Sequence, residues 1–256
     1  MDIQPIYSCS VGIDVHLNLL VVCVIIQHEQ DSEPEVQQRQ FGGFKKDRKE
    51  MAQWIASFSP DIVVMESTGI YWKSPYTALE NQGILATVVN AKHVKKVPGR
   101  KTDISDAQWL AILARSGLLK GSFIPPKDFR QLRQLTRYHD CLTSQLRAEK
   151  NRLVKTLSDA GIRLSAVVSD THGKAATAMI DCLLNGGTPE KALKHVGRLK
   201  APKEELLASL EGELTEEHQL VAKMQREHIE YLYRQLDSIK KNCYIVSNLI
   251  NKRWTY

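Results

Sequence analysis

Residues 8–27 read SCSVGIDVHLNLLVVCVIIQ, and this stretch decides the fold. Residues 8–14 are short, apolar and β-prone, and residues 19–27 are rich in the β-branched side chains that favour a buried strand. Only residues 16–18 form the connection between them. The stretch therefore predicts a β-hairpin whose first strand ends at Asp14.

The chain then alternates between β-patterns and helical patterns up to about residue 116. Further strands are expected at residues 36–41, 61–65 and 84–89, and helices at 45–58, 71–81 and 103–116. Three strands followed by helix–strand units predict an α/β fold, in which a mixed sheet has helices on its faces. This order matches the RNase H-like arrangement.

Pro125 and Pro126 interrupt the pattern, and we expect a domain boundary there, between residues 1–124 and 125–256. Beyond it the chain is expected to be helical. One amphipathic helix is predicted at residues 128–160, and a second long helix at 203–251. Heptad spacing in the second predicts a coiled coil or a helical hairpin. The apolar residues with that spacing are Leu207, Leu210, Leu214, Val221, Met224 and Tyr231.

Charge and cysteine content limit the classes of protein that fit. The net charge of +6 favours polyanionic partners, chiefly nucleic acid. The five cysteines include no C-x-x-C pair, which argues against a zinc ribbon and a disulfide framework. No signal peptide is evident, and the longest apolar stretch, residues 19–26, is too short to span a bilayer. We expect a cytoplasmic protein.

Four acidic residues stand where they could carry chemistry. Asp14 and Glu66 each end an apolar strand, on a rigid element facing a cleft. Asp103 and Asp106 are three residues apart at the predicted start of a helix, where such side chains point the same way. Carboxylates supply the oxygen ligands that Mg²⁺ prefers, and two ions about 3.5–4 Å apart stabilise both reacting oxygens of a phosphodiester. We expect all four acids to lie in one metal-binding cluster.

Each acid also has a simpler interpretation. Asp103 and Asp106 could be ordinary acids in the first turn of a helix, favoured by its dipole. Asp14 and Glu66 are harder to explain in this way, because a buried charge without a partner is costly after an apolar strand. The four together favour metal-assisted cleavage or transfer at phosphorus.

Three motifs resemble those of a known family. They are GIDVH at residues 12–16, MESTGIYW at 65–72 and KTDISDAQWLA at 101–111. They are similar to the DEDD-type insertion-sequence transposases, a family that includes the Piv-type DNA invertases and has a RuvC-like catalytic domain. The resemblance implies an enzyme that cleaves and transfers DNA strands, with two Mg²⁺ or Mn²⁺ ions and a guide RNA. It also implies the catalytic metal ligands: Asp14, Glu66, Asp103 and Asp106.

The chain departs from the family pattern at two places. Leu17 stands where the family often has a lysine after GIDVH. The family continues into a second domain that contributes a nucleophilic serine, whereas this sequence stops at Tyr256, and we do not assign that role to Ser247. We therefore expect a truncated copy or a fragment. Such a chain could hold metal without completing strand exchange, or act as a non-catalytic, dimerising nucleic-acid-binding modulator of an intact transposase.

Basic residues in two segments are expected to bind nucleic acid. One group precedes the acid pair, and the other shares a face of the helix predicted at residues 128–160. They are Lys92, Lys95, Lys96, Arg100, Lys101, Arg130, Arg133 and Arg137. A solvated loop is the alternative for the first group, and the wet face of a coiled coil fits the second equally well. The long helices are also expected to join copies of the chain into a homo-oligomer.

Another enzyme class shares part of the N-terminal pattern. Actin-like kinases and ATPases also begin with a strand carrying Gly-Ile-Asp before a hairpin. They require Gly-rich phosphate loops, and this sequence contains none. The sequence disfavours this alternative.

Overall fold

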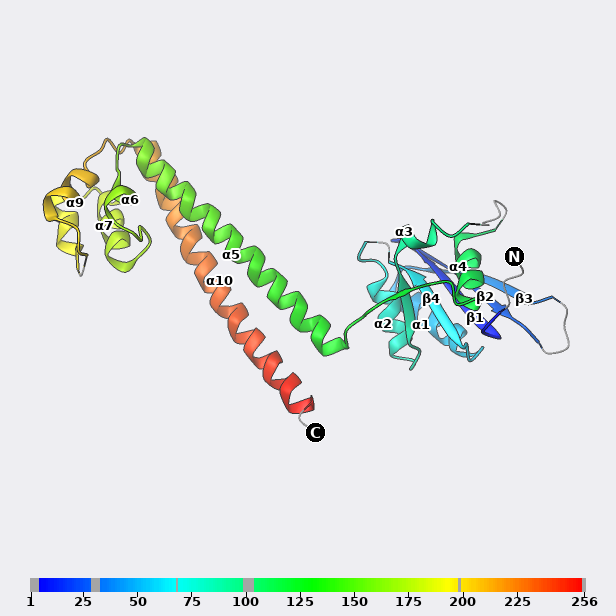
Figure 1. Ribbon diagram of the computed structural model, residues 1–256. Coiled ribbons are helices and arrows are strands. Elements are labelled where there is room, and N and C mark those ends of the chain that lie inside the picture. The colour runs from blue at the N-terminus through cyan, green and yellow to red at the C-terminus, as the bar shows by residue number, and fades with distance from the viewer. Residues whose placement is uncertain (1–4, 29–32, 68, 99–103, 198, 255–256) are drawn as a thin grey trace. The chain divides into compact units, whose positions relative to one another are not determined.

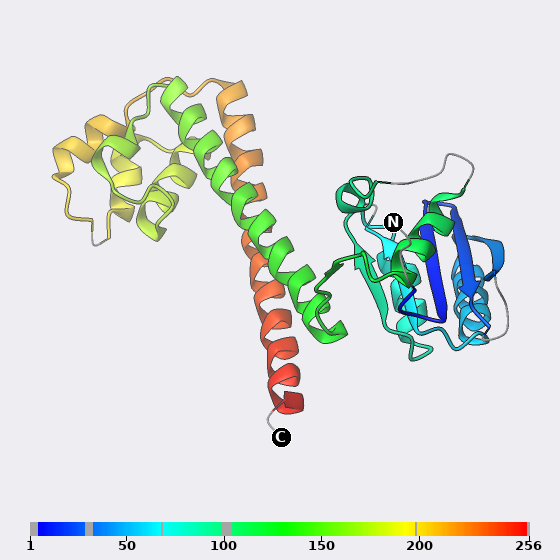
Figure 2. The ribbon, with the colours of Figure 1, turned by 45° about the vertical axis from the view of Figure 1, so that its right-hand side comes forward.

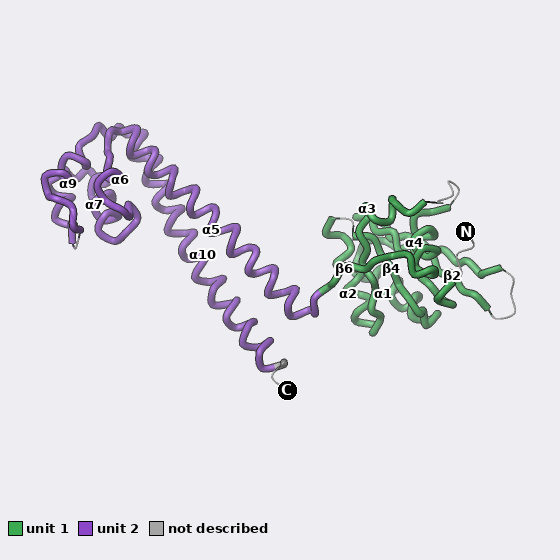
Figure 3. Tube along the Cα trace, viewed as in Figure 1, with its two compact units in different colours: residues 1–124 green, residues 125–256 purple. Residues whose placement is uncertain are grey.

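The computed structural model describes residues 5–28, 33–67, 69–98, 104–197 and 199–254. The chain forms two compact units (Figures 1 and 3). Unit 1 comprises Met1–Ile124 and unit 2 comprises Pro125–Tyr256. No helix in the described ranges is long and apolar enough to cross a membrane.

A mixed sheet forms the centre of unit 1. Within the described residues its strands are β1 (Cys9–Val15), β2 (Leu19–Ile26), β3 (Glu35–Gly42), β4 (Ile62–Glu66), β5 (Ala86–Val89) and β6 (Gly121–Ser122). They lie in the order β3-β2-β1-β4-β5-β6. The first three strands pair antiparallel, and β1, β4 and β5 pair parallel. This hairpin-led order confirms the RNase H-like α/β fold expected from the sequence.

Helices cover both faces of the sheet (Figures 1 and 2). Side chains alternate between the faces of a strand, and the Ile13 face of β1 packs against α1 (Lys45–Ala56) and α2 (Lys73–Glu80). The opposite face packs against α4 (Asp106–Arg115). A short helix that the sequence did not suggest, α3 (Ala91–Val94), directly follows β5. The end of β4 lies between α3 and the start of α4, since Glu66, Val94 and Asp106 line one cavity.

The start of α4 differs from the sequence prediction. The helix begins at Asp106, not at Asp103, because Ser105 caps it. Ser105 has extended backbone dihedrals, and its hydroxyl oxygen accepts a hydrogen bond of 3.1 Å from the Gln108 amide. The expectation that both acids share one helical face therefore has no support from the described helix, and Asp103 itself lies outside the described residues.

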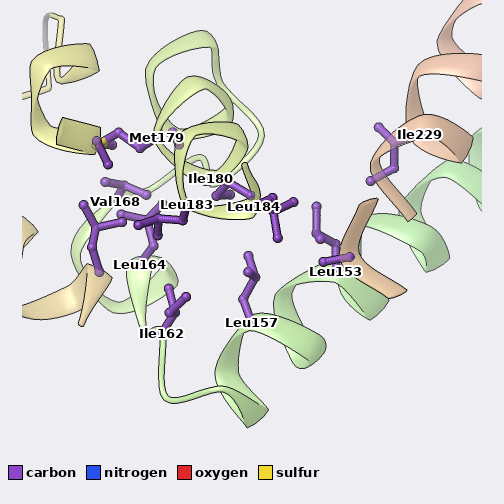
Figure 4. Close-up of a cluster of buried hydrophobic side chains, with 14 of the residues drawn as sticks. Leu153, Leu157, Ile162, Leu164, Val168, Met179, Ile180, Leu183, Leu184 and Ile229 are labelled. Carbon is purple, nitrogen blue, oxygen red and sulfur yellow. The ribbon is translucent and has the colours of Figure 1, made fainter. Parts of the chain in front are cut away.

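Two long helices run antiparallel along unit 2, α5 (Lys127–Asp159) and α10 (Glu216–Trp254). Shorter helices fill the segment between them: α6 (Leu164–Val167), α7 (Lys174–Leu184), α8 (Pro189–Ala192), a 3₁₀ helix (Leu193–His195) and α9 (Lys203–Leu210). Figure 4 shows how Leu153 and Leu157 of α5 meet Ile180 and Leu184 of α7, with Ile229 of α10 nearby. The shorter helices thus share one apolar core with the long pair.

The long helix predicted at residues 203–251 is divided in two by residues 211–215. Gly212 lies against the end of α5, where a Cβ would overlap the Ala160 carbonyl oxygen and lie 3.0 Å from the Ile162 amide. The Glu213 amide donates a hydrogen bond of 2.8 Å to the same carbonyl. Thr215 then caps α10, since its hydroxyl oxygen accepts a hydrogen bond from the His218 amide.

This break also makes the predicted heptad seam wrong. Val221, Met224 and Tyr231 are 43%, 62% and 49% exposed. The residues of α10 that are buried against α5 have the same heptad spacing, but each lies one position later in the sequence than the predicted seam. They include Ala222, Ile229, Leu232 and Leu236. The five-residue interruption shifts the helical phase, so a frame carried over from Leu207 selects the outer side of α10.

Candidate functional site

The register of the sheet brings Asp14 and Glu66 together. The parallel strands β1 and β4 pair Ile13 with Met65, and each acid is the next residue of its strand. Ile13 and Met65 are fully buried on the face covered by α1 and α2. Asp14 and Glu66 therefore point to the opposite face, on neighbouring strands about 4.8 Å apart.

The helix on that face approaches β1 at Gly12. A Cβ at this position would overlap the Ala107 carbonyl oxygen and lie 2.5 Å from the Ala111 amide nitrogen. Two residues earlier in β1, the buried Ser10 hydroxyl donates a hydrogen bond of 3.1 Å to the Ala111 carbonyl. The contacts show that α4 runs against the direction of β1, so its first residue, Asp106, lies towards the Asp14 end of the strand.

A cavity of about 140 Å³ lies beside two of these acids. Glu66 and Asp106 both line it, as does Lys95, which follows α3. Its remaining wall is largely apolar: Val94, Val97, Trp109 and Leu110. Two of the predicted acids and one of the predicted cations thus face a single small space.

Asp14 has a histidine as its neighbour. His16 stands in the hairpin turn, where its amide donates a hydrogen bond of 2.9 Å to the Leu19 carbonyl. Its Nε2 atom lies 3.0 Å from Oδ2 of Asp14. The Asp14 side chain is 15% exposed, so this contact reaches a carboxylate that solvent barely touches. His16 is therefore both a turn residue and a contact of the first acid.

The donor chemistry of the site fits a hard divalent cation, because three described carboxylates occupy one face of the sheet near the ends of β1 and β4. Among the described residues, no three His, Cys, Asp or Glu side chains lie close enough together to hold an ion. Asp103, the fourth acid, lies outside those residues. The single cluster of four acids remains a prediction.

The predicted basic residues divide into distinct environments. Lys92, Lys95 and Lys96 lie on and just after α3, which is capped by Asn90 and anchored by the buried Val94. All three lysines are exposed, and of the three only Lys95 lines the cavity. Arg100 and Lys101 lie outside the described residues.

On α5, the predicted arginines also differ. Nη1 of Arg130 donates a hydrogen bond of 2.8 Å to the Pro125 carbonyl, which ties this side chain to the start of its own helix. Arg133 and Arg137 are exposed. These two arginines are the better candidates for a phosphate backbone.

Sequence reasoning missed Ser10 and the contact made by Gly12. A polar residue inside a buried strand and a glycine two positions later were the available signals, since a glycine within a strand often marks close backbone approach. The partner could not be identified in this way, because Ala111 is 101 positions from Ser10 in the sequence.

Comparison with known proteins adds a family and several structural likenesses. Among solved structures the chain is similar to Thermus thermophilus RuvC, with 14% identity and a TM-score of 0.33 over 44% of this chain and 98% of that one. It is also similar to the same RuvC in complex with a Holliday junction substrate, with 14% identity and a TM-score of 0.32 over 44% and 99% of the two chains. The chain is similar as well to a Fowlpox virus resolvase in complex with Holliday junction DNA. The sequence identity is 12% and the TM-score is 0.31, over 42% of this chain and 98% of that one.

The family comparison covers more of the chain. No curated protein sequence matches it. Residues 11–162 match the family model of the IS110 DEDD transposases, which is described as a transposase. The matched segment contains Asp14, Glu66 and Asp106 and exceeds half of the sequence. The chain belongs to the IS110 family of DEDD transposases.

Proposed function

We propose that the chain cleaves and transfers DNA strands as a transposase or site-specific recombinase, using two divalent ions held by Asp14, Glu66, Asp103 and Asp106. The observation that carries this proposal is the location of three of these acids on one face of the sheet, where Glu66 and Asp106 line the same cavity. They come from β1, β4 and α4, which are far apart in the sequence. Membership in the transposase family gives the reaction class.

The protein's part in this chemistry is to hold negative charges at fixed places. Asp14 and Glu66 are placed by strand register, and Asp106 by the packing of α4 on Gly12. The dipole of α4 favours the charged form of a carboxylate in its first turn. Neighbouring carboxylates repel one another, so a dication between them relieves that repulsion. Bound Mg²⁺ or Mn²⁺ would activate the attacking oxygen and stabilise the leaving one.

The first experiment measures Mn²⁺ binding and the cleavage of branched and duplex DNA by the wild type, Asp14→Asn and Glu66→Gln. We expect each substitution to weaken Mn²⁺ binding at least about tenfold, since each removes one charged ligand, and to abolish cleavage. Glu50→Gln is the matched control, because Glu50 is an exposed acid of α1 on the other face of the sheet. Unchanged Mn²⁺ affinity in Asp14→Asn would refute the proposal.

A guide RNA is the second proposed partner. The family resemblance motivates this partner, and the exposed Arg133 and Arg137 on α5 offer a binding face. We expect the double variant Arg133→Gln/Arg137→Gln to bind structured RNA more weakly and with a shallower salt dependence. Lys223→Gln/Lys240→Gln, which removes two exposed charges from α10, serves as the control. Equal losses in the two double variants would argue against a specific face on α5.

A second candidate function is association with other copies or with an intact relative, which would let the chain modulate transposition without cleaving DNA. The observation that favours it is an outer stripe on α10, exposed and apolar at heptad-related positions: Val221, Met224, Tyr231, Ile245 and Leu249. We expect light scattering to find a dimer, and Met224→Glu/Ile245→Glu to convert it to a monomer. Leu85→Glu, at an exposed leucine of unit 1, is the control.

A further inference from the structure

The three lysines near α3 carry the same charge but occupy different surroundings. Lys95 lines the cavity that Glu66 and Asp106 also line. Lys92 and Lys96, three positions before it and one after it, do not line this cavity, although all three side chains are exposed. No described residue forms an ion pair with Lys95. Its charge is therefore available to a ligand that enters the cavity.

The position of Lys95 is fixed by local structure. Oδ1 of Asn90 accepts a hydrogen bond of 2.9 Å from the Lys92 amide and so caps α3. The Lys95 amide closes the turn by donating a hydrogen bond of 3.0 Å to the Ala91 carbonyl. Val94 is buried beneath it against the α4 layer. Because the backbone is held at both ends of this turn, the Lys95 side chain starts from a defined point on the cavity rim.

We propose that Lys95 binds the DNA phosphate that enters this cavity, whereas Lys92 and Lys96 contribute only general attraction to DNA. The proposal rests on the proposed function and assigns a separate task to one lysine within it. A phosphate oxygen is the group that would fit between an ammonium on one side and carboxylate-bound cations on the other.

Size and surroundings support this assignment. The cavity of about 140 Å³ exceeds the volume of one water molecule, roughly 30 Å³. Its walls include the apolar side chains of Val97, Trp109 and Leu110. Charges interact more strongly beside such walls than in open water, so an ammonium on the cavity rim attracts a phosphate more strongly than a lysine outside the cavity does.

The first test compares the DNA affinity of Lys95→Gln, Lys92→Gln and Lys96→Gln in EDTA and in Ca²⁺, which allows binding to be measured without cleavage. In EDTA we expect similar, small losses in all three variants, because each removes one cation from the surface. In Ca²⁺ we expect the wild type, Lys92→Gln and Lys96→Gln to bind more tightly than in EDTA. Lys95→Gln should lose most of this Ca²⁺-dependent gain.

The second test needs no DNA. An ammonium beside two carboxylates repels a dication, so Lys95→Gln should bind Mn²⁺ about threefold more tightly than the wild type. Lys95→Arg keeps the charge and should bind Mn²⁺ as the wild type does. Lys92→Gln and Lys96→Gln should leave the Mn²⁺ affinity unchanged, because these two lysines lie outside the cavity, where water and salt screen their charges.

The outcomes separate this inference from the proposed function. If the wild type binds Mn²⁺ and DNA but Lys95→Gln behaves as Lys92→Gln and Lys96→Gln do in both tests, the special role of Lys95 is overturned while the proposed function stands. A wild type that binds neither Mn²⁺ nor DNA overturns the proposed function and this inference with it.

Discussion

Units 1 and 2 are each organised around a long-range contact, but the two contacts are built differently. In unit 1, α4 packs on β1 at Gly12, where main-chain atoms meet directly, and two residues earlier at Ser10. In unit 2, α5 and α10 pack along a repeated series of apolar side chains such as Leu153 and Ile229. The first contact depends on few positions, and it also places Asp106 of α4 near the Asp14 end of β1. The second is distributed over many positions, so each should matter less.

The largest effect is expected from Gly12→Ala. A new methyl group would overlap the Ala107 carbonyl, and the free energy of unfolding should fall by about 3 kcal/mol or more. The Gly12→Ala protein that still folds should also bind Mn²⁺ more weakly, because α4 carries Asp106. Chemical denaturation and Mn²⁺ titration of the full chain measure both quantities.

Gly173→Ala is the control for this prediction. Gly173 precedes α7 with a negative φ, and its nearest neighbour to a new Cβ is the Asp170 side chain at 3.3 Å. This substitution should change stability little. Equal stability of Gly12→Ala and Gly173→Ala would remove the basis for treating the contact at Gly12 as special.

The next largest effect is expected from Leu153→Ala, in the apolar core that α5 and α10 share in unit 2. Leu153 is fully buried, and its truncation should reduce the free energy of unfolding by about 2 kcal/mol. Neighbouring side chains along the helix pair can partly close the space. The Mn²⁺ affinity should not change, which would separate loss of stability from loss of the site. A clear fall in Mn²⁺ affinity would show that the units are energetically coupled.

A pair of buried serines sharpens the comparison further. Ser10→Ala removes the hydrogen bond to Ala111 and should cost about 1 kcal/mol of stability. Ser209→Ala removes a similar bond in unit 2, of 2.8 Å to the Leu206 carbonyl, and should cost about the same. Only Ser10→Ala should also weaken Mn²⁺ binding, about twofold, since it loosens α4. Identical Mn²⁺ affinities in the two variants would mean that Ser10 has a structural role alone.

The smallest effect concerns pH and unit 2. The pKa of His172 is lowered from its ordinary value of 6.5, mainly by burial, with Lys150 and Arg226 adding to the shift and Asp170 opposing it. As the pH falls through 6.5, the unfolded chain takes up a proton before the folded chain does, so stability decreases. His172→Gln should reduce this loss between pH 7 and pH 5, as followed by thermal unfolding. An unaltered pH dependence would exclude His172 as its source.

Local patterns predicted most of unit 1. The strand around Asp14 and the helix around Met51 are each defined by periodicity over fewer than fifteen residues. The positions of Asp14 and Glu66 at strand ends were also evident. Short elements such as α3 and β6 were not, because four or two residues carry no period. The environment of Lys95 could therefore not be anticipated.

The sequence was less informative where the heptad spacing was extended across the break between α9 and α10. The apolar residues from Leu207 to Tyr231 suggested one continuous helix, although Gly212 lies between them. Only the contact of Gly212 with Ala160 explains why the chain turns there. A glycine in a helical pattern is tolerated often enough that its presence alone does not predict a break.

The contact at Gly12 also limits how this domain can evolve. The atoms that would collide with a larger residue at position 12 include the main-chain oxygen of Ala107 and the main-chain nitrogen of Ala111. Replacing either alanine by glycine leaves those atoms in place, so neither change can restore the fit. A genetic suppressor would have to move the whole helix, and with it the carboxylate at its first residue. Selection can therefore retain this glycine through the geometry of the backbone alone.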